Sequence, residues 1–268
     1  MASCKSKVES ESGGQQMSNA KDIAELGRVL AGAGNIALRQ DNRAVFQALP
    51  DDCIDLILTD PPYKDYQSNR PVKRQKVRKI EGADFDLTYF LEQSNRVLKP
   101  GCHFYCWCDH TTFPAIFQAI KDLEDKFPAG KRLNYKNCLV WVKNNHGSGD
   151  LRGDYAPQHE FIIFAVKGKG KKLKGGRRSN VFFKRTDKGI EFFPKVSNYS
   201  YHHGTVKPAA ILRMLIEAST EEQDLVFDPY AGVMSTAEAC IFSGRRYLMV
   251  ELVEEHFRNG VERINRLI

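Results

Sequence analysis

The chain has 268 residues, of which 42% are hydrophobic and 27% are charged. This balance is typical of an ordinary globular protein and excludes collagen-like, coiled-coil and wholly disordered chains. No apolar run approaches the ~20 residues that a membrane helix needs, and the first residues lack the apolar segment of a secretory signal. We therefore expect a cytoplasmic protein without membrane contact, whose seven cysteines are thiols.

Elements predicted from apolar periodicity alternate between strands and helices. Residues 1–20 are rich in Ser, Gly and Gln and predict a disordered tail, whereas residues 21–268 predict a single domain. In chain order the elements are strand 35–38, helix 43–49, strand 54–59, helix 87–98, strand 103–107, helix 113–127, strands 137–142 and 160–166, helix 208–219, strand 225–227, helix 235–243, strand 247–250 and helix 254–267. This order predicts an α/β fold with a doubly wound, mostly parallel sheet. The two consecutive strands predict an antiparallel hairpin at one sheet edge.

Positive charge is concentrated in two stretches. Residues 64–79 hold seven Lys or Arg against one Asp, and residues 167–188 hold ten against one, so they carry +6 and +9. Because the whole chain carries +7, the remaining residues carry −8. Such stretches suit a polyanion, since neutralising phosphates releases counterions. The alternative is a pair of solvated loops.

The motif Asp60-Pro61-Pro62-Tyr63 directly follows the predicted strand 54–59. Ligands of a doubly wound sheet bind beyond the carboxyl ends of its strands. There, Asp60 and the Pro61 carbonyl could accept the two N–H bonds of a planar exocyclic amine while Tyr63 stacks on its ring. The alternative is a rigid turn at the end of a strand.

A second motif, 228–236, follows the strand 225–227 and opens a helix. Small residues at Ala231 and Gly232 allow close approach to a ligand, and the helix N-terminus at Ser235 favours a carboxylate. Glu251 ends the next strand, where an acidic side chain can hold ribose hydroxyls or simply face solvent. Asp41 could bind an adenine amine, cap the helix 43–49, or do both.

A third motif, His203-Gly204-Thr205-Val206-Lys207-Pro208, precedes a helix with Pro208 at its favoured first position. It could be only the start of a helix. It could also bring the Thr205 hydroxyl and the Lys207 cation to one end of the same pocket.

In this order the three motifs resemble those of the beta-group amino-methyltransferases of DNA. Supporting segments are also similar to theirs: 96–101, 140–143, His159-Glu160 and 244–251. The resemblance covers about residues 35–267 and implies the S-adenosylmethionine-dependent methyltransferase fold. It implies an adenine target, because cytosine-amino members more often carry Ser in place of Asp60. One departure stands out: the family usually reads Gly-x-Gly-Thr-Thr where this chain has Gly232-Val233-Met234-Ser235-Thr236.

The resemblance also implies site residues. The catalytic motif would be Asp60, Pro61, Pro62 and Tyr63. The cofactor, S-adenosylmethionine, would be bound by Asp41, His203, Thr205, Lys207, Asp228, Tyr230, Ala231, Gly232, Ser235, Thr236 and Glu251.

The basic stretches predict contact with DNA. We expect a DNA-contacting loop at 64–86, which follows the catalytic motif, and a small target-recognition insertion at 168–201. The residues assigned to nucleic-acid binding are Lys64, Arg70, Lys73, Arg74, Lys76, Arg78, Lys171, Lys172, Arg177 and Arg178. A cognate restriction endonuclease is a candidate partner, and we expect a monomer or homodimer.

Two further patterns have alternative interpretations. Cys102, Cys106, Cys108 and His110 have the residue types of a zinc site, but even-numbered residues share one face of a strand, which favours buried thiols. The aromatic pairs at 182–183 and 192–193 favour the core of a small subdomain over a base-stacking platform.

The sequence therefore predicts a DNA adenine N6-methyltransferase that flips its target base out of the duplex. The transfer would be direct, because a C5-cytosine mechanism needs a cysteine nucleophile, usually as Pro-Cys, and the chain has no Pro-Cys. The alternatives are a methyltransferase for cytosine N4 or an RNA base, and a catalytically inactive nucleic-acid-binding protein.

Overall fold

The computed structural model describes residues 7–8, 20–62, 85–146, 152–153, 155–186, 188–194 and 206–268. Its strands are β1 (Lys7–Val8), β2 (Ile36–Arg39), β3 (Ile54–Thr59), β4 (Leu98–Cys108), β5 (Leu133–Val142), β6 (His159–Lys167), β7 (Val181–Phe182), β8 (Lys184–Thr186), β9 (Gly189–Glu191), β10 (Leu225–Asp228) and β11 (Arg246–Glu251). Its helices are α1 (Ala20–Leu30), α2 (Asn42–Ala48), α3 (Leu87–Val97), α4 (Phe113–Asp122), α5 (Ala209–Ser219), α6 (Ser235–Ser243) and α7 (Glu254–Asn265), with a 3₁₀ turn at Ala129–Lys131.

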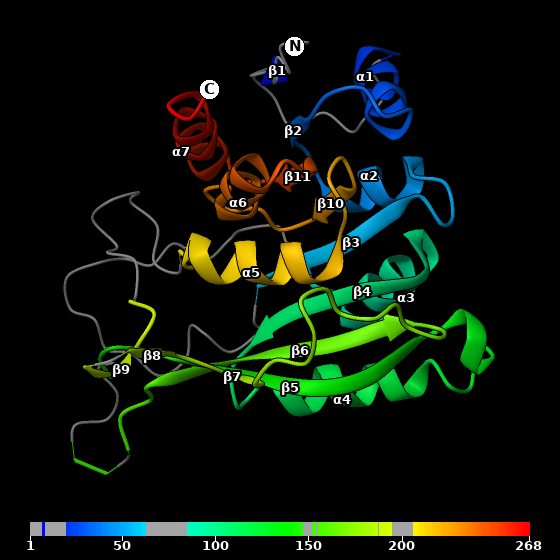
Figure 1. Cartoon of the computed structure of the whole chain (residues 1–268). Coiled ribbons are helices and arrows are strands. Elements are labelled where there is room, and N and C mark those ends of the chain that lie inside the picture. Colours follow the sequence, from blue (N-terminus) through cyan, green and yellow to red (C-terminus); the bar gives the residue numbers. More distant parts are fainter. Residues whose placement is uncertain are drawn as a thin grey trace.

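One mixed sheet organises the described part of the chain, in the order β1-β2-β11-β10-β3-β4-β6-β5-β7 (Figure 1). The strands from β1 to β4 in this order pair in parallel, whereas β6 pairs antiparallel with both β4 and β5. The predicted mostly parallel sheet and its antiparallel hairpin are therefore confirmed. The hairpin is not itself the edge of the sheet in the described part of the chain, because the two-residue strand β7 pairs with β5 and forms that edge.

Helices cover both faces of the sheet, as the alternation of side chains along buried strands requires. On one face, Phe104 and Cys106 of β4 pack with residues of α2, α3 and α4. On the other, Tyr105 and Trp107 pack with residues of α5, α6 and α7. Figure 1 shows α5 crossing the sheet on the face opposite α3 and α4. The cysteines 102, 106 and 108 are buried on the α3/α4 face, as the buried-thiol interpretation predicts.

Most element bounds agree with the predictions to within two residues, but helix α1 was not predicted, and β5 begins at Leu133 rather than at residue 137. The predicted strand 103–107 begins earlier, at Leu98, because the Lys99-Pro100-Gly101 turn lies inside β4 as an irregularity: Ile54 pairs with Leu98 and Leu56 with His103. Gly101 there has φ of +81°, which a glycine adopts without steric cost. Helix α4 ends at Asp122 rather than at Phe127.

Several predictions concern residues that the structure describes only in part. Within the predicted tail, Lys7–Val8 pair with β2; the tail and the single-domain division stay predictions. The loop 64–86 lies outside the described residues except for Phe85 and Asp86. Of the helices that are described, none is long and apolar enough to cross a membrane.

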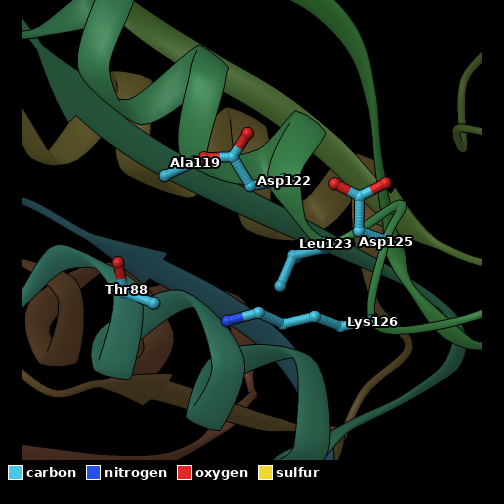
Figure 2. Close-up of a pocket in the computed structure, with 6 residues that line it drawn as sticks. All are labelled: Thr88, Ala119, Asp122, Leu123, Asp125 and Lys126. Carbon is cyan, nitrogen blue, oxygen red and sulfur yellow. The ribbon is translucent and has the colours of Figure 1, made fainter.

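A hollow of about 290 Å³ lies between α3 and α4. Figure 2 shows the six residues that line it: Thr88, Ala119, Asp122, Leu123, Asp125 and Lys126. Its lining includes none of the predicted site residues. The carboxyl ends of the parallel strands are the place where ligands of such a sheet bind.

Candidate active site

The first and second motifs lie side by side at the ends of two adjacent strands. Strands β3 and β10 pair in parallel, with Ile57 opposite Phe227. The Thr59 hydroxyl donates a hydrogen bond to Asp228 Oδ1 at 2.7 Å, directly across the two strand ends. Asp60, which follows Thr59, is therefore next to the turn that begins at Asp228.

Asp228 is a buried carboxylate that organises this turn. Thr236 Oγ1 donates to its Oδ2 at 2.7 Å and the Tyr230 N–H to its Oδ1 at 3.1 Å. Burial raises the pKa of Asp228 to about 6, and the hydrogen bonds from Thr59, Thr236 and the Tyr230 N–H oppose that rise. Both oxygens of the carboxylate thus accept hydrogen bonds from the protein itself, and these bonds connect β3, β10 and α6.

The turn ends at Met234, the residue that departs from the family pattern. Met234 has φ of 60° and ψ of 38°, a left-handed conformation that favours glycine, and its side chain is fully buried. It precedes α6 without a capping side-chain hydrogen bond. The first N–H groups of a helix have no intrahelical acceptor, so this helix end suits a carboxylate ligand.

Glu251 lies beside the same turn at the end of β11. Its Oε2 accepts the Gly232 N–H and its Oε1 accepts the Val253 N–H, both at 2.8 Å. Burial raises the pKa of Glu251 to about 7, against the effect of these N–H donors. A carboxylate has about four acceptor positions, so the group can still receive hydroxyl donors.

Asp41 reaches this group of strand ends through α2. It is the N-cap of α2, and its Oδ1 accepts the Arg43 N–H at 2.9 Å. The neighbouring Gln40 N–H donates to the Glu251 carbonyl at 3.1 Å, and Asn42 Nδ2 donates to the Pro229 carbonyl at 3.3 Å. The capping interpretation of Asp41 is confirmed, and the residue lies next to Glu251 and the second motif.

An alternating row of charges extends from Asp60. Lys207 Nζ lies 2.6 Å from Asp60 Oδ2 and 3.0 Å from Glu160 Oε2, and Lys143 Nζ lies 2.7 Å from Glu160 Oε1. Burial favours the neutral form of Lys207, but the two carboxylates together raise its pKa above its usual range. Burial likewise opposes the charge of Glu160, yet Lys207 and Lys143 lower its pKa below the usual value. Lys207 and Glu160 are therefore both charged near neutral pH.

The family model of DNA methylases, N6_N4_Mtase, matches residues 54–262 of the chain. The chain belongs to this family. It is 25% identical over 255 residues to the DNA adenine methyltransferase YhdJ of Escherichia coli K12, covering 84% of this chain and 81% of that protein.

Two solved structures have the same fold as this DNA methylase. The M1.HpyAVI-SAM complex has a TM-score of 0.61 at 20% identity and covers 85% of this chain and 98% of that chain. The cytosine-N4-specific PvuII DNA methyltransferase has a TM-score of 0.59 at 15% identity and covers 85% of both chains. The predicted fold class is confirmed, and the family embraces both N6 and N4 enzymes.

Other predicted site residues of the methylase either contact protein groups or lie outside the described residues. Ser235 Oγ accepts a hydrogen bond from Arg263 Nη1 at 2.9 Å, and Thr236 Oγ1 donates one to Asp228. Both hydroxyls therefore bond to side chains of the protein and stabilise the turn. Tyr230 packs edge-on against Phe90 at 5.5 Å between ring centroids. Nine of the predicted residues lie outside the described part of the chain: Tyr63, His203, Thr205, Lys64, Arg70, Lys73, Arg74, Lys76 and Arg78.

The second basic stretch begins far from Asp60. It follows β6, which runs antiparallel to β4, so it leaves the sheet at the amino ends of the parallel strands. The Lys171 N–H donates to the Gly101 carbonyl, and the Lys174 N–H donates to the Ala218 carbonyl at the end of α5. Arg177 and Arg178 are exposed on the segment that returns to β7. Their contact with DNA stays a prediction.

Sequence reasoning did not assign a role to Glu160, Lys143 or Trp107. The first two were singled out only as parts of segments similar to the family's. The third lies in β4, where Lys207 Nζ is 5.1 Å from the centroid of its ring. A signal was present: an acidic residue opens β6 and a basic one follows β5, at the end of a predicted hairpin. The Asp60 partner, 147 positions away from Lys207 in the chain, could not be read from that pattern.

Proposed function

We propose that this DNA methylase transfers a methyl group from S-adenosylmethionine to N6 of adenine in DNA. The Thr59–Asp228 hydrogen bond of 2.7 Å supports this proposal more than any other observation. It fixes the Asp60-Pro61-Pro62 tip of β3 beside the turn 228–236, so that an amine held by one motif can meet a donor held by the other.

The residues around that turn fit the donor. The donor supplies a methyl group on a positively charged sulfur, next to a ribose and an amino-acid carboxylate. Glu251 could accept the ribose hydroxyls, and the uncapped N-terminus of α6 could receive the carboxylate. Ala231 and Gly232 allow the donor close to the backbone. Asp41, beside Glu251, could accept from the adenine amine of the donor.

The target amine would be held by Asp60 and the Pro61 carbonyl. Two accepted N–H bonds orient the nitrogen lone pair toward the methyl carbon, where an N–C bond forms as the C–S bond breaks. Positive charge grows on the nitrogen during this step, and the Asp60 carboxylate stabilises it. The extra proton then leaves the nitrogen for Asp60 or water. The base must first be flipped, because its amine is paired within the duplex.

Product analysis tests the proposal directly. Protein, methyl-labelled S-adenosylmethionine and unmodified duplex DNA are incubated, and the DNA is digested to nucleosides. We expect the label in N6-methyladenine. An Asp60→Ala variant supplies the matched control and should transfer no label above background.

A second candidate target is cytosine N4, because the PvuII enzyme of that specificity shares the fold. Label in N4-methylcytosine would establish this alternative, and label transferred to RNA in competition with DNA would establish the RNA alternative. If the protein binds DNA but calorimetry detects no binding of S-adenosylmethionine, it is an inactive DNA-binding protein. The cognate endonuclease and the oligomeric state stay predictions.

A further inference from the structure

We infer that Lys207 and Glu160 are positioning residues for Asp60: Lys207 holds the Asp60 carboxylate in place, and Glu160 offsets the charge of Lys207. This inference rests on the proposed function, in which Asp60 receives the target amine. It gives Lys207 a role different from the cofactor contact that the sequence predicts. The Lys207 ammonium is 2.6 Å from Asp60 and 3.0 Å from Glu160, so two carboxylates share it.

Lys207 paired with Asp60 alone would oppose the reaction. The attacking nitrogen gains positive charge, and a carboxylate neutralised by its own cation stabilises that charge poorly. Because Glu160 takes up part of the Lys207 charge, the three groups together stay negative. Lys143 holds the other Glu160 oxygen at 2.7 Å. It therefore orients the Glu160 carboxylate, whose other oxygen is paired with Lys207.

Two buried indole rings hold both ammonium groups beside these carboxylates. Lys207 Nζ is 5.1 Å from the ring centroid of Trp107, and Lys143 Nζ is 5.5 Å from that of Trp141. The two rings pack edge to face, with centroids 5.8 Å apart. Cation–π attraction is strongest where water is excluded, and both rings are 1% exposed. The row of charges therefore rests on the buried rings of the core, and its side chains are 9% to 23% exposed.

Other titratable groups also face Asp60. Asp228 comes from β10, and Cys106 and Cys108 come from β4; burial raises the pKa of each, and the Asp60 charge adds to this effect. The two thiols therefore stay neutral and do not titrate with Asp60. Asp228 also titrates, with a pKa of about 6, so a signal must be assigned to Asp60 by comparison with an Asp60→Asn variant.

Carboxyl NMR titration of the ¹³C-aspartate-labelled protein measures the effect without any methyl transfer. Lys207→Met removes the cation and leaves Asp60 near Glu160, so the midpoint of the Asp60 titration should rise by about 1 to 2 pH units. Glu160→Gln removes an anion, so the midpoint should fall. The double variant should return it toward the wild-type value, because the two charges cancel.

Matched controls come from the surface ion pair between Glu92 of α3 and Lys126, which lies in the turn after α4; Figure 2 shows Lys126 beside the hollow between α3 and α4. Lys126→Met and Glu92→Gln should leave the Asp60 midpoint unchanged. Thermal melting checks that each variant folds. If Lys207→Met does not fold, Lys143→Met supplies the test, and a smaller rise is expected. Shifts in the same direction for Lys207→Met and Glu160→Gln, or no shifts, overturn the inference.

Single-turnover methyl transfer separates this inference from the proposed function. Glu160→Gln should slow transfer about tenfold or more while the Kd for S-adenosylmethionine stays within about twofold of wild type. A weakened Kd with an unchanged rate would assign Lys207 and Glu160 to donor binding and overturn the inference. If the wild-type protein transfers no methyl group, the proposed function fails, whereas the NMR titration still decides whether the two residues control Asp60.

Discussion

The side chain of Met234 occupies the space that a side chain at position 260 would need. A Cβ built on Gly260 would lie 2.6 Å from Met234 Cγ, 3.2 Å from Met234 Cβ and 3.1 Å from the Val233 carbonyl carbon. Real Cβ atoms essentially never lie within 3.0 Å of another atom, so the contact with Met234 Cγ would force a shift. A glycine in α7 thus accommodates the methionine that replaces the family's usual glycine before α6.

This relationship predicts opposite effects of two glycine-to-alanine substitutions in helices. Gly27→Ala in α1 meets nothing within 4 Å and should stabilise the protein by about 0.5 to 1 kcal/mol, because alanine is the better helix former. Gly260→Ala should destabilise it by about 1 to 3 kcal/mol through overpacking. Urea unfolding measures both free energies, and a stabilising Gly260→Ala would contradict the close contact.

The coupling itself is measured by a double-mutant cycle. Met234→Gly removes the backbone strain of a methionine in the left-handed conformation, which should stabilise the folded state by about 1 to 2 kcal/mol. It also removes a fully buried side chain, which should destabilise the folded state by about 2 to 5 kcal/mol. The single variant should therefore be less stable than wild type. In the Met234→Gly, Gly260→Ala double variant the added methyl group enters the vacated space, so the two losses should sum to more than the measured loss. Simple additivity would show that the two residues are independent.

The strand and helix positions of this fold were predictable because their signals are local. The strand 54–59 and the helix 235–243 match their predicted bounds, since buried parallel strands are continuous apolar runs and helix ends carry turn signals. The strands β7, β8 and β9 are two or three residues long, too short for a periodic pattern. In the aromatic pairs, Phe182 is buried in the core, whereas Phe192 is 39% exposed.

The site was predictable only to the level of motifs. Local sequence brings Asp60 and Asp228 to strand ends, and the parallel order of β3 and β10 then makes them neighbours. The direction of a side chain across the sheet is a tertiary property. The meeting of Lys207 with Asp60 depends on where α5 begins relative to the end of β3, and the opposite placement of Lys171 depends on the antiparallel direction of β6. Neither fact is encoded in a window of neighbouring residues.

Asp228 predicts a pH dependence of stability. The pKa of Asp228 is about 6 in the folded protein against 3.8 for an unperturbed aspartate, so the folded state binds more protons between these values. Stability from this group is therefore highest below about pH 4 and is lost as pH rises through 6, by roughly 3 kcal/mol in total. An Asp228→Asn variant lacks this titration, so the difference in free energy of unfolding, wild type minus variant, should fall as pH rises from 4 to 7.

A second substitution checks the cause of the Asp228 effect. Thr236→Val removes a donor to Oδ2 and leaves a side chain of nearly the same shape. The ionised carboxylate is then less well solvated, so the upper end of the titration should move above pH 6. A stability difference that does not vary with pH in either variant would show that Asp228 does not titrate in this range.

Glu251 predicts a pH dependence of donor binding. Its pKa is about 7, mainly because it is buried, and ribose hydroxyls donate best to the ionised carboxylate. Binding of S-adenosylmethionine, measured by calorimetry, should therefore weaken as pH falls below 7, by up to about tenfold per pH unit. Glu251→Gln should bind more weakly at pH 8 and lose this dependence.

His256 provides the control for the Glu251 prediction, because its Nδ1 lies 3.8 Å from Glu251 Oε1. Burial lowers the pKa of His256, so the imidazole is mostly neutral where Glu251 titrates. His256→Gln should keep the pH dependence of binding. If that variant loses the dependence and Glu251→Gln retains it, the titrating group is the histidine.

The two basic stretches predict different contributions to DNA binding. Residues 64–79 directly follow the catalytic motif in the chain, whereas Lys171 bonds to Gly101, five residues before Cys106, which pairs with Thr59. At about 3.3 Å per residue this places Lys171 roughly 17 Å along the strand from the site. A triple alanine variant at Arg74, Lys76 and Arg78 should therefore lose more phosphate contacts than one at Lys171, Lys172 and Arg177.

Fluorescence anisotropy with a labelled duplex over a range of NaCl concentrations measures this difference. Each lost phosphate contact reduces the slope of log K against log salt by about 0.9. The first triple variant should therefore flatten the slope by roughly 2 to 3, and the second by less than about 1. Both variants carry the same change of net charge, so a nonspecific effect of charge would flatten the two slopes equally. Equal flattening would therefore contradict the prediction that residues 64–79 make more of the phosphate contacts than the stretch after β6.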